Sequence, residues 1–148
     1  MSGDLTVSKL TGTVASGGVE ATAGTGNEYF LSSQIIGNSL IKEGDIAIFS
    51  VRYSDTDSYK TTALNLNTRY PVNRDWRLNP RLQFTYRTNN QNSGTQSTIK
   101  PSFRMDYRWK RRVRFELEAA GEWSDENLSD QTEKKSAYFF NTGYRIDF

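Results

Sequence analysis

The chain has 148 residues, the length of a single domain, and contains neither cysteine nor histidine. Without cysteine it has no disulfide framework or thiolate metal site, and without histidine it lacks the commonest general base and metal ligand. The net charge of +2 and the mean hydropathy of -0.72 leave no strong bias toward nucleic acid and no run of ~20 apolar residues for a membrane-spanning helix. We therefore expect no metal, no cofactor and no nucleic-acid partner.

The N-terminal third of the chain gives the weakest pattern. Its first part, Gly3 to Gly26, is rich in Gly, Ser, Thr and Ala and sets no clear strand register. Two segments with partial alternation follow, Glu28 to Ile36 and Asp45 to Tyr53, and each is expected to form a strand. We divide the chain at about Gly18, with residues 1–17 as a lead-in segment or extra strand and residues 18–148 as the folded domain.

The rest of the chain alternates apolar and polar residues with a period of two, as β-strands do. In Val113 to Trp123 every odd-numbered residue is apolar or glycine, and the even-numbered residues are charged except Ala120. Pro80 and Pro101 interrupt two such segments, so we expect bulges or locally broken pairing there. The other segments with this alternation are Leu64 to Tyr70, Trp76 to Arg87, Ile99 to Trp109 and Tyr138 to Phe148.

The connections between the later strands alternate in length. Pro71 to Asp75 and Lys110 to Arg112 are short turns, whereas Asn89 to Gln96 and Ser124 to Lys135 are longer polar loops. Single-chain outer-membrane barrels have an even number of strands, short periplasmic turns and longer external loops. The pattern predicts an all-β, closed, antiparallel up-and-down transmembrane barrel of about eight strands, and a count of ten stays open.

Aromatic residues gather toward the ends of the predicted strands. Such sorting is typical of the two girdles of a membrane barrel, whereas a dry core gives no reason for it. The predicted girdle residues are Tyr70, Trp76, Tyr107 and Trp109 near the short turns, and Tyr53, Tyr86, Trp123 and Tyr138 near the long loops.

The polar face of the strands carries charges of both signs. Because the interior of an eight-stranded barrel is just wide enough for side chains, we expect these groups to form an ion-paired network that fills the lumen. The predicted network is Arg81, Arg104, Asp106, Arg108, Arg114, Glu116, Glu118, Arg145 and Asp147.

The last eight residues, Asn141 to Phe148, combine a polar residue, a glycine, an apolar residue and a terminal aromatic residue at fixed offsets. This ending resembles the β-signal that the barrel-assembly machinery of bacterial outer membranes reads. The resemblance implies outer-membrane localisation, with the lipid bilayer and the assembly machinery as partners. The residues that match this assembly signal are Asn141, Gly143, Tyr144, Ile146 and Phe148.

A second resemblance is carried by the segment Arg69 to Leu82 together with the ending Gly143 to Phe148. These residues are similar to the C-terminal barrel segments of larger proteobacterial envelope proteins, some of which carry tetratricopeptide repeats. The resemblance extends over roughly residues 40–148. It implies that the chain is a membrane-anchoring domain of a longer Gram-negative cell-envelope protein with a periplasmic domain.

The sequence therefore predicts a membrane anchor or structural barrel and no enzyme, since a Ser–His arrangement cannot be built without histidine. Two alternatives stay open. A narrow, porin-like pore that prefers anions would use the excess of arginine on the polar face. A soluble β-sandwich that acts as a binding module would show the same alternation in each strand.

Overall fold

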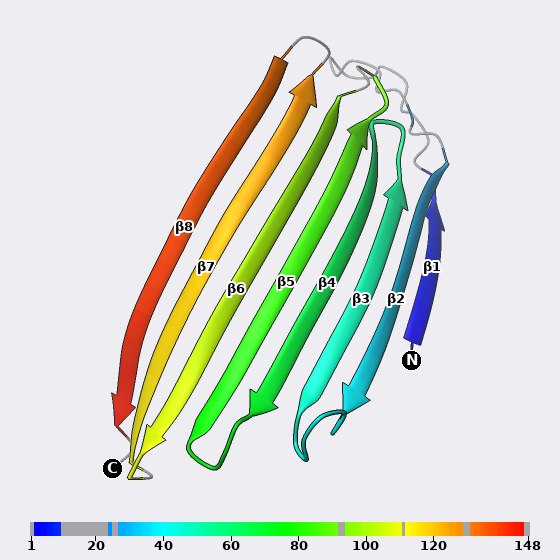
Figure 1. The fold of residues 1–148 in the computed structure, drawn as a ribbon. Coiled ribbons are helices and arrows are strands. Elements are labelled where there is room, and N and C mark those ends of the chain that lie inside the picture. Colours follow the sequence, from blue (N-terminus) through cyan, green and yellow to red (C-terminus); the bar gives the residue numbers. More distant parts are fainter. Residues whose placement is uncertain are drawn as a thin grey trace, which may run out of the picture.

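The structure is a computed structural model that describes residues 2–9, 24, 27–91, 94–110, 112–128 and 131–146. Strands pair in chain order, each antiparallel to the next, in one up-and-down sheet (Figure 1). Within the described ranges, no helix has the length and apolar character needed to cross a membrane. The strands are β1 (Ser2–Ser8), β2 (Glu28–Asn38), β3 (Ile46–Asp55), β4 (Tyr59–Pro71), β5 (Trp76–Asn89), β6 (Thr95–Trp109), β7 (Val113–Leu128) and β8 (Gln131–Ile146).

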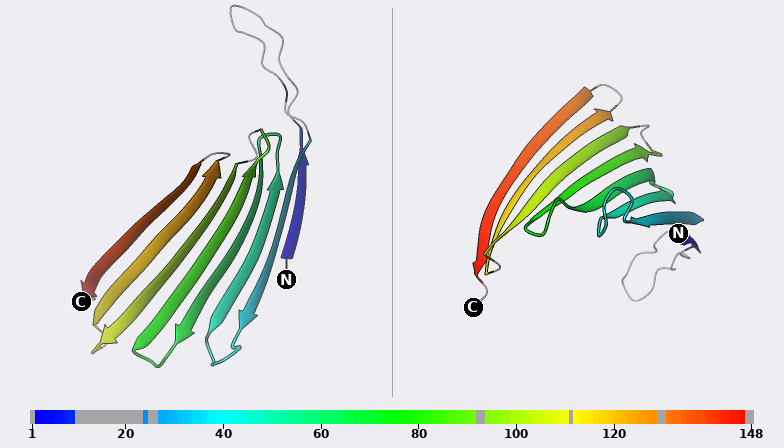
Figure 2. Two further views of the ribbon diagram at one scale, coloured as in Figure 1. Left: turned by 45° about the horizontal axis from the view of Figure 1, so that its top comes forward. Right: turned by 60° about the horizontal axis from the view of Figure 1, so that its bottom comes forward.

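Among the described residues the sheet is open, so the predicted closure is absent there. The all-β class and the antiparallel up-and-down order are confirmed, and the described residues form eight strands, as predicted. Figure 2 shows a curved sheet with β1 and β8 at opposite sides. The two edge strands are poorly matched, because β1 has 7 residues and β8 has 16. Direct pairing with β1 would therefore satisfy fewer than half of the residues along β8.

The strands continue beyond the segments that alternation predicts. The expected loop Ser124 to Lys135 is wrong, because β7 extends to Leu128 and β8 begins at Gln131. The expected loop Asn89 to Gln96 shortens to residues 90–94. The cause is that residues on both faces are polar here, so the hydrophobic alternation stops while backbone pairing continues and sets Asp125 opposite Lys134.

At the N-terminus, β1 lies inside residues 1–17, the segment expected to be a lead-in or an extra strand. Its residues pair with the first part of β2, from Ser8 opposite Glu28 to Ser2 opposite Gln34. The proposed boundary at Gly18 lies outside the described residues.

The two prolines break the ladders locally without a bulge. The β4–β5 pairing stops after Asn67 opposite Arg81 and resumes at Tyr70 opposite Leu78, on either side of Pro80 and in unchanged register. The β6–β7 pairing is interrupted in the same way at Pro101. A proline nitrogen cannot donate to a ladder, so pairing is lost on the side that this nitrogen faces. The expected broken pairing is confirmed, and the alternative of a bulge is not.

The uninterrupted registers sort the side chains onto two faces. One row of the apolar face runs from Trp76 through Tyr107 and Phe115 to Tyr144, each residue directly opposite the next. Among the described residues no apolar side chain is buried. The sheet is therefore a single layer, and its apolar face has no covering layer in the described part of the chain.

Candidate lipid-facing surface and charged face

All eight predicted girdle residues lie on the apolar face, in two bands. In the band at the short turns, the Trp76 and Tyr107 rings stack with centroids 4.3 Å apart, and Tyr107 lies 6.3 Å from Phe115. Tyr70 is opposite Leu78 in the same part of the sheet, and Trp109 is 46% exposed at the end of β6.

The second band lies toward the other end of the strands. The Trp123 and Tyr138 rings meet edge to face with centroids 5.6 Å apart. Tyr53 and Tyr86 are opposite the same residue, Thr62, from its two neighbouring strands. The ring of Trp123 lies over Gly121, where an added Cβ would come within 2.6 Å of the indole.

The sheet is hollowed on its polar face. One hollow, of about 430 Å³, is lined by three consecutive residues from each of five strands: two on the polar face and the apolar-face residue between them. On β5 these are Arg81, Leu82 and Gln83, so the polar side chains flank a floor formed by the backbone of the middle residue. A second hollow near β1 follows the same pattern, with Ser50 and Arg52 on either side of Val51. The polar face is thus the concave one.

The concave face carries an ion-pair cluster centred on Arg104. The Arg104 guanidinium bonds the Asp106 carboxylate at 3.1 Å and the Glu116 carboxylate at 2.9 Å. Asp106 also accepts a hydrogen bond of 3.1 Å from the Asn79 side chain, and only 15% of its own side chain is exposed. Asp106 and Glu116 are directly opposite each other, so Arg104 neutralises two like charges at once.

The other predicted network residues that the structure describes lie on the same face, in several rows. Arg81 is opposite Ser102, and Glu118 is opposite Arg104. Arg108, Arg114 and Arg145 form one row across β6, β7 and β8. Asp147 lies outside the described residues.

Two polar-face residues outside the predicted network also bond to residues of the charged face. One is Asn79, and the other is Glu122, which pairs with Lys100 at 2.9 Å beside the interruption at Pro101. Both residues occupy polar positions of alternating strands, so the alternation could have indicated the face on which they lie. Which partner each one reaches depends on the register between strands.

The turn between β2 and β3 was also missed. The Asp45 carboxylate accepts hydrogen bonds from the backbone N–H groups of Leu40, Ile41 and Lys42, at 2.7, 2.7 and 2.9 Å. The bond from Lys42 is the main cause that lowers the pKa of Asp45 below its ordinary 3.8, while burial opposes it. The Lys42 ammonium donates to the backbone carbonyl of Val72, which links this turn to the one between β4 and β5.

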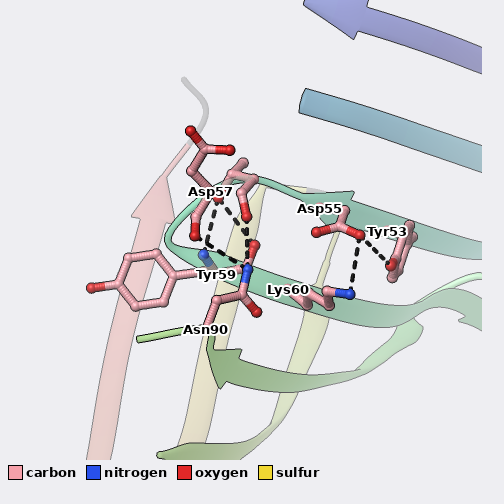
Figure 3. Close-up of polar contacts among 7 residues, drawn as sticks. Tyr53, Asp55, Asp57, Tyr59, Lys60 and Asn90 are labelled. Carbon is pink, nitrogen blue, oxygen red and sulfur yellow. Dashed lines mark hydrogen bonds and ion pairs between the residues drawn. The ribbon is translucent and has the colours of Figure 1, made fainter. Parts of the chain in front are cut away.

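Neighbouring turns at the opposite end of the sheet are also tied together (Figure 3). The Asn90 side-chain amide donates to the backbone carbonyls of Thr56 and Asp57, at 2.9 and 3.3 Å. Asp55 pairs with Lys60 at 3.4 Å and accepts a hydrogen bond of 3.3 Å from the Tyr53 hydroxyl. Asn90, just after β5, therefore ties the start of its connection to the turn after β3.

The residues of the predicted assembly signal lie along the free edge of the sheet. Asn141 and Gly143 are on the polar face of β8, whereas Tyr144 and Ile146 are on the apolar face. Every residue of β8 is exposed. Phe148 lies outside the described residues. In the described ranges no group of three metal-ligating side chains comes together.

Comparison of the chain with protein-family models, with curated proteins and with solved structures finds no match in any of the three.

Proposed function

We propose that the chain is the membrane-anchoring barrel domain of a larger envelope protein of the bacterial outer membrane. The observation that carries this proposal is the inverted curvature: the concave face is polar and charged, and the convex face is apolar and uncovered. A soluble barrel or sandwich places its apolar face inward. A membrane barrel places its apolar band outward and its polar side chains in the lumen.

The dimensions of the apolar band support this proposal. From Val113 to Trp123 the strand advances by ten residues. At about 3.3 Å per residue and a tilt of ~40°, this segment rises ~25 Å, the height of the apolar band of an outer-membrane barrel. The two aromatic bands lie near its ends. Beyond Trp123, β7 continues with polar residues on both faces as far as Asn127, as expected where a strand leaves the bilayer.

Lipid contact requires closure, because lipid offers no hydrogen bonds to the unpaired backbone groups of a free edge. We propose that β8 pairs with a strand on the N-terminal side of the sheet, either β1 or a further strand. The β-signal resemblance of Asn141 to Phe148 fits this role, since such a signal works as a strand that adds to another sheet edge.

The Arg104 cluster supports an anchor over an open channel. It lies on the concave face, where the lumen of a small barrel is just wide enough for side chains. We therefore expect planar bilayers that contain the protein to show no conductance steps. Regular anion-selective steps would favour the pore instead.

The proposal is tested by purification and refolding of the chain. A membrane barrel would need detergent or phospholipid vesicles to fold, and its folded form would migrate differently from its boiled form on a gel. A folded, monodisperse protein in buffer without detergent would contradict the proposal.

Closure is tested with cysteine pairs, which the cysteine-free sequence makes simple to interpret. Thr6→Cys on β1 is combined in turn with Lys135→Cys, Ala137→Cys or Phe139→Cys on β8, all on the polar face. A disulfide in the folded, inserted protein would show direct β1–β8 pairing. Gln83→Cys on the central strand β5 replaces the β8 partner in the control.

A further inference from the structure

Charge is unevenly distributed along the concave face. At the short-turn end, Arg108 and Arg114 are directly opposite each other, and Arg145 is opposite Arg114 on the next strand. Arg77 interacts electrostatically with Arg69, Arg108 and Arg114, and also with the carboxylate of Asp106. Like charges directly across a ladder are unfavourable unless a group of opposite sign lies between them.

The neighbouring row of the same face holds a pair of like charges that does have a shared counterion. There, Asp106 is opposite Glu116, and Arg104 bonds both carboxylates. No ion pair joins Arg108 or Arg114 to a carboxylate within the described part of the chain, and Asp106 and Glu116 both pair with Arg104. Among the described residues, Arg108 and Arg114 thus have no shared counterion like the one Arg104 provides for the two carboxylates.

The arginines border a defined hollow of about 50 Å³ at this end of the face. Its cationic side chains are Arg74, Arg77, Arg108 and Arg114, and its carboxylates are Asp75 and Asp106. The lining therefore carries two more positive than negative charges. A hollow needs about 10–15 Å³ to hold one water molecule, so this one has room for a small anion.

We propose that this hollow is a binding site for a multivalent phosphate-class oxyanion, with Arg77, Arg108 and Arg114 as its ligands. The three side chains come from β5, β6 and β7 and reach one hollow from three strands. A guanidinium group offers paired N–H donors that match two oxygens of a phosphate or carboxylate. Three such groups exceed what a single carboxylate can accept, whereas a tetrahedral oxyanion presents enough oxygens for all of them.

In the proposed barrel the site would lie at the mouth on the short-turn side. It depends on the concave face and not on lipid, so the two proposals can fail separately. A chain that inserts into vesicles without binding phosphate would overturn this inference alone. A chain that binds phosphate but folds in plain buffer would overturn the barrel alone.

The test is calorimetric titration of the folded protein with inorganic phosphate, pyrophosphate and citrate, with ionic strength held constant by sodium chloride. We expect both phosphate ligands to bind, pyrophosphate more tightly than inorganic phosphate. Arg108→Gln and Arg114→Gln should each weaken binding about 10- to 100-fold, the usual effect of losing a charge-assisted hydrogen bond. Arg77→Gln carries the same test should either variant fail to fold.

The matched control is Arg52→Gln, which removes the same charge from the same face on β3. Its affinity should equal that of the unchanged chain. Three results would overturn the site: no binding above the chloride background, equal affinity for citrate and pyrophosphate, or a loss in Arg52→Gln as large as in Arg114→Gln. The last result would mean that binding follows net charge and not a built site.

Discussion

The two faces of this sheet differ in what surrounds their side chains. On the apolar face, Phe103, Leu82 and Phe115 are 39%, 40% and 44% exposed, with no second layer over them among the described residues. On the polar face, Asp106 is 15% exposed and bonds both Arg104 and Asn79. A sheet folded for water does the reverse, since it buries its apolar face and solvates its charges. The proposed barrel would account for this difference, because it exposes its apolar face to lipid and encloses its charges in the lumen.

The largest loss of stability should come from a charge placed on the apolar face. Leu82→Arg places a cation near the middle of the proposed lipid-facing band, where arginine costs about 2–4 kcal/mol. Gln83→Arg adds the same side chain one residue later, on the concave face, and should cost far less. Urea unfolding of both variants in phospholipid vesicles measures the difference. Equal losses of stability would contradict the assignment of the two faces.

The next largest loss of stability should come from a substitution at the centre of the charged face. Arg104→Met leaves two carboxylates without their shared cation and should cost roughly 1–3 kcal/mol. Lys100→Met breaks a single pair in which both side chains are 44% exposed, and its cost should stay below about 1 kcal/mol. The same unfolding measurement ranks the two variants. A larger loss for Lys100→Met would mean that Arg104 does not organise this face.

Asp45 provides a reference outside both faces, in the turn between β2 and β3. Asp45→Ala removes the acceptor of three backbone N–H groups and should lower the stability of the folded chain. The pKa of Asp45 is lower in the folded chain than its ordinary 3.8. Its contribution is therefore complete above that value and is lost as the pH falls through the lowered pKa.

Unfolding of the unchanged chain and of Asp45→Ala, measured from pH 7 to pH 2, tests this pH dependence of the stability. The stability difference between the two should shrink only in the acid part of the range. A difference that stays constant down to the lowest pH would show that ionisation of Asp45 contributes nothing to the turn.

The smallest effect should come from two glycines on opposite faces. Gly121→Ala brings a methyl group against the Trp123 ring, which has to shift. The overpacking cost of about 1 kcal/mol or more is partly offset by the ~0.5–1 kcal/mol that alanine gains over glycine within a strand. Gly143→Ala meets nothing within 4 Å and should be neutral or slightly stabilising. Tryptophan fluorescence should change only for Gly121→Ala. A change in both variants would mean that the Trp123 ring is not fixed over Gly121.

The sequence predicted the faces of the later strands well because a period of two leaves a direct trace in the residue order. It placed all eight girdle residues on one face, and the registers confirm this. It could not place the strand ends, because Ser124 to Asn127 and Thr132 to Lys135 are polar on both faces while still paired. It also predicted a closed sheet, whereas closure depends on how the two edge strands match and not on alternation within each strand.

The partners within the charged face were predictable only in part. Alternation put Arg104, Asp106 and Glu116 on one face, and the structure brings them together. Arg104 is directly opposite Glu118, yet it bonds Glu116 on the diagonal. The direction of a long side chain decides this choice. The Asp45 turn could not be predicted from the residue order, because its hydrogen bonds join a side chain to the backbone.

The most direct test of the account asks what surrounds the apolar face. The chain contains three tryptophans, Trp76, Trp109 and Trp123, and all lie on that face in the two aromatic bands. Variants that keep one tryptophan each would be folded into vesicles whose lipids carry bromine at different depths. We predict that each tryptophan is quenched, most strongly by bromine near the headgroups. If no brominated lipid quenches any of the three, the apolar face does not contact lipid and the account is wrong.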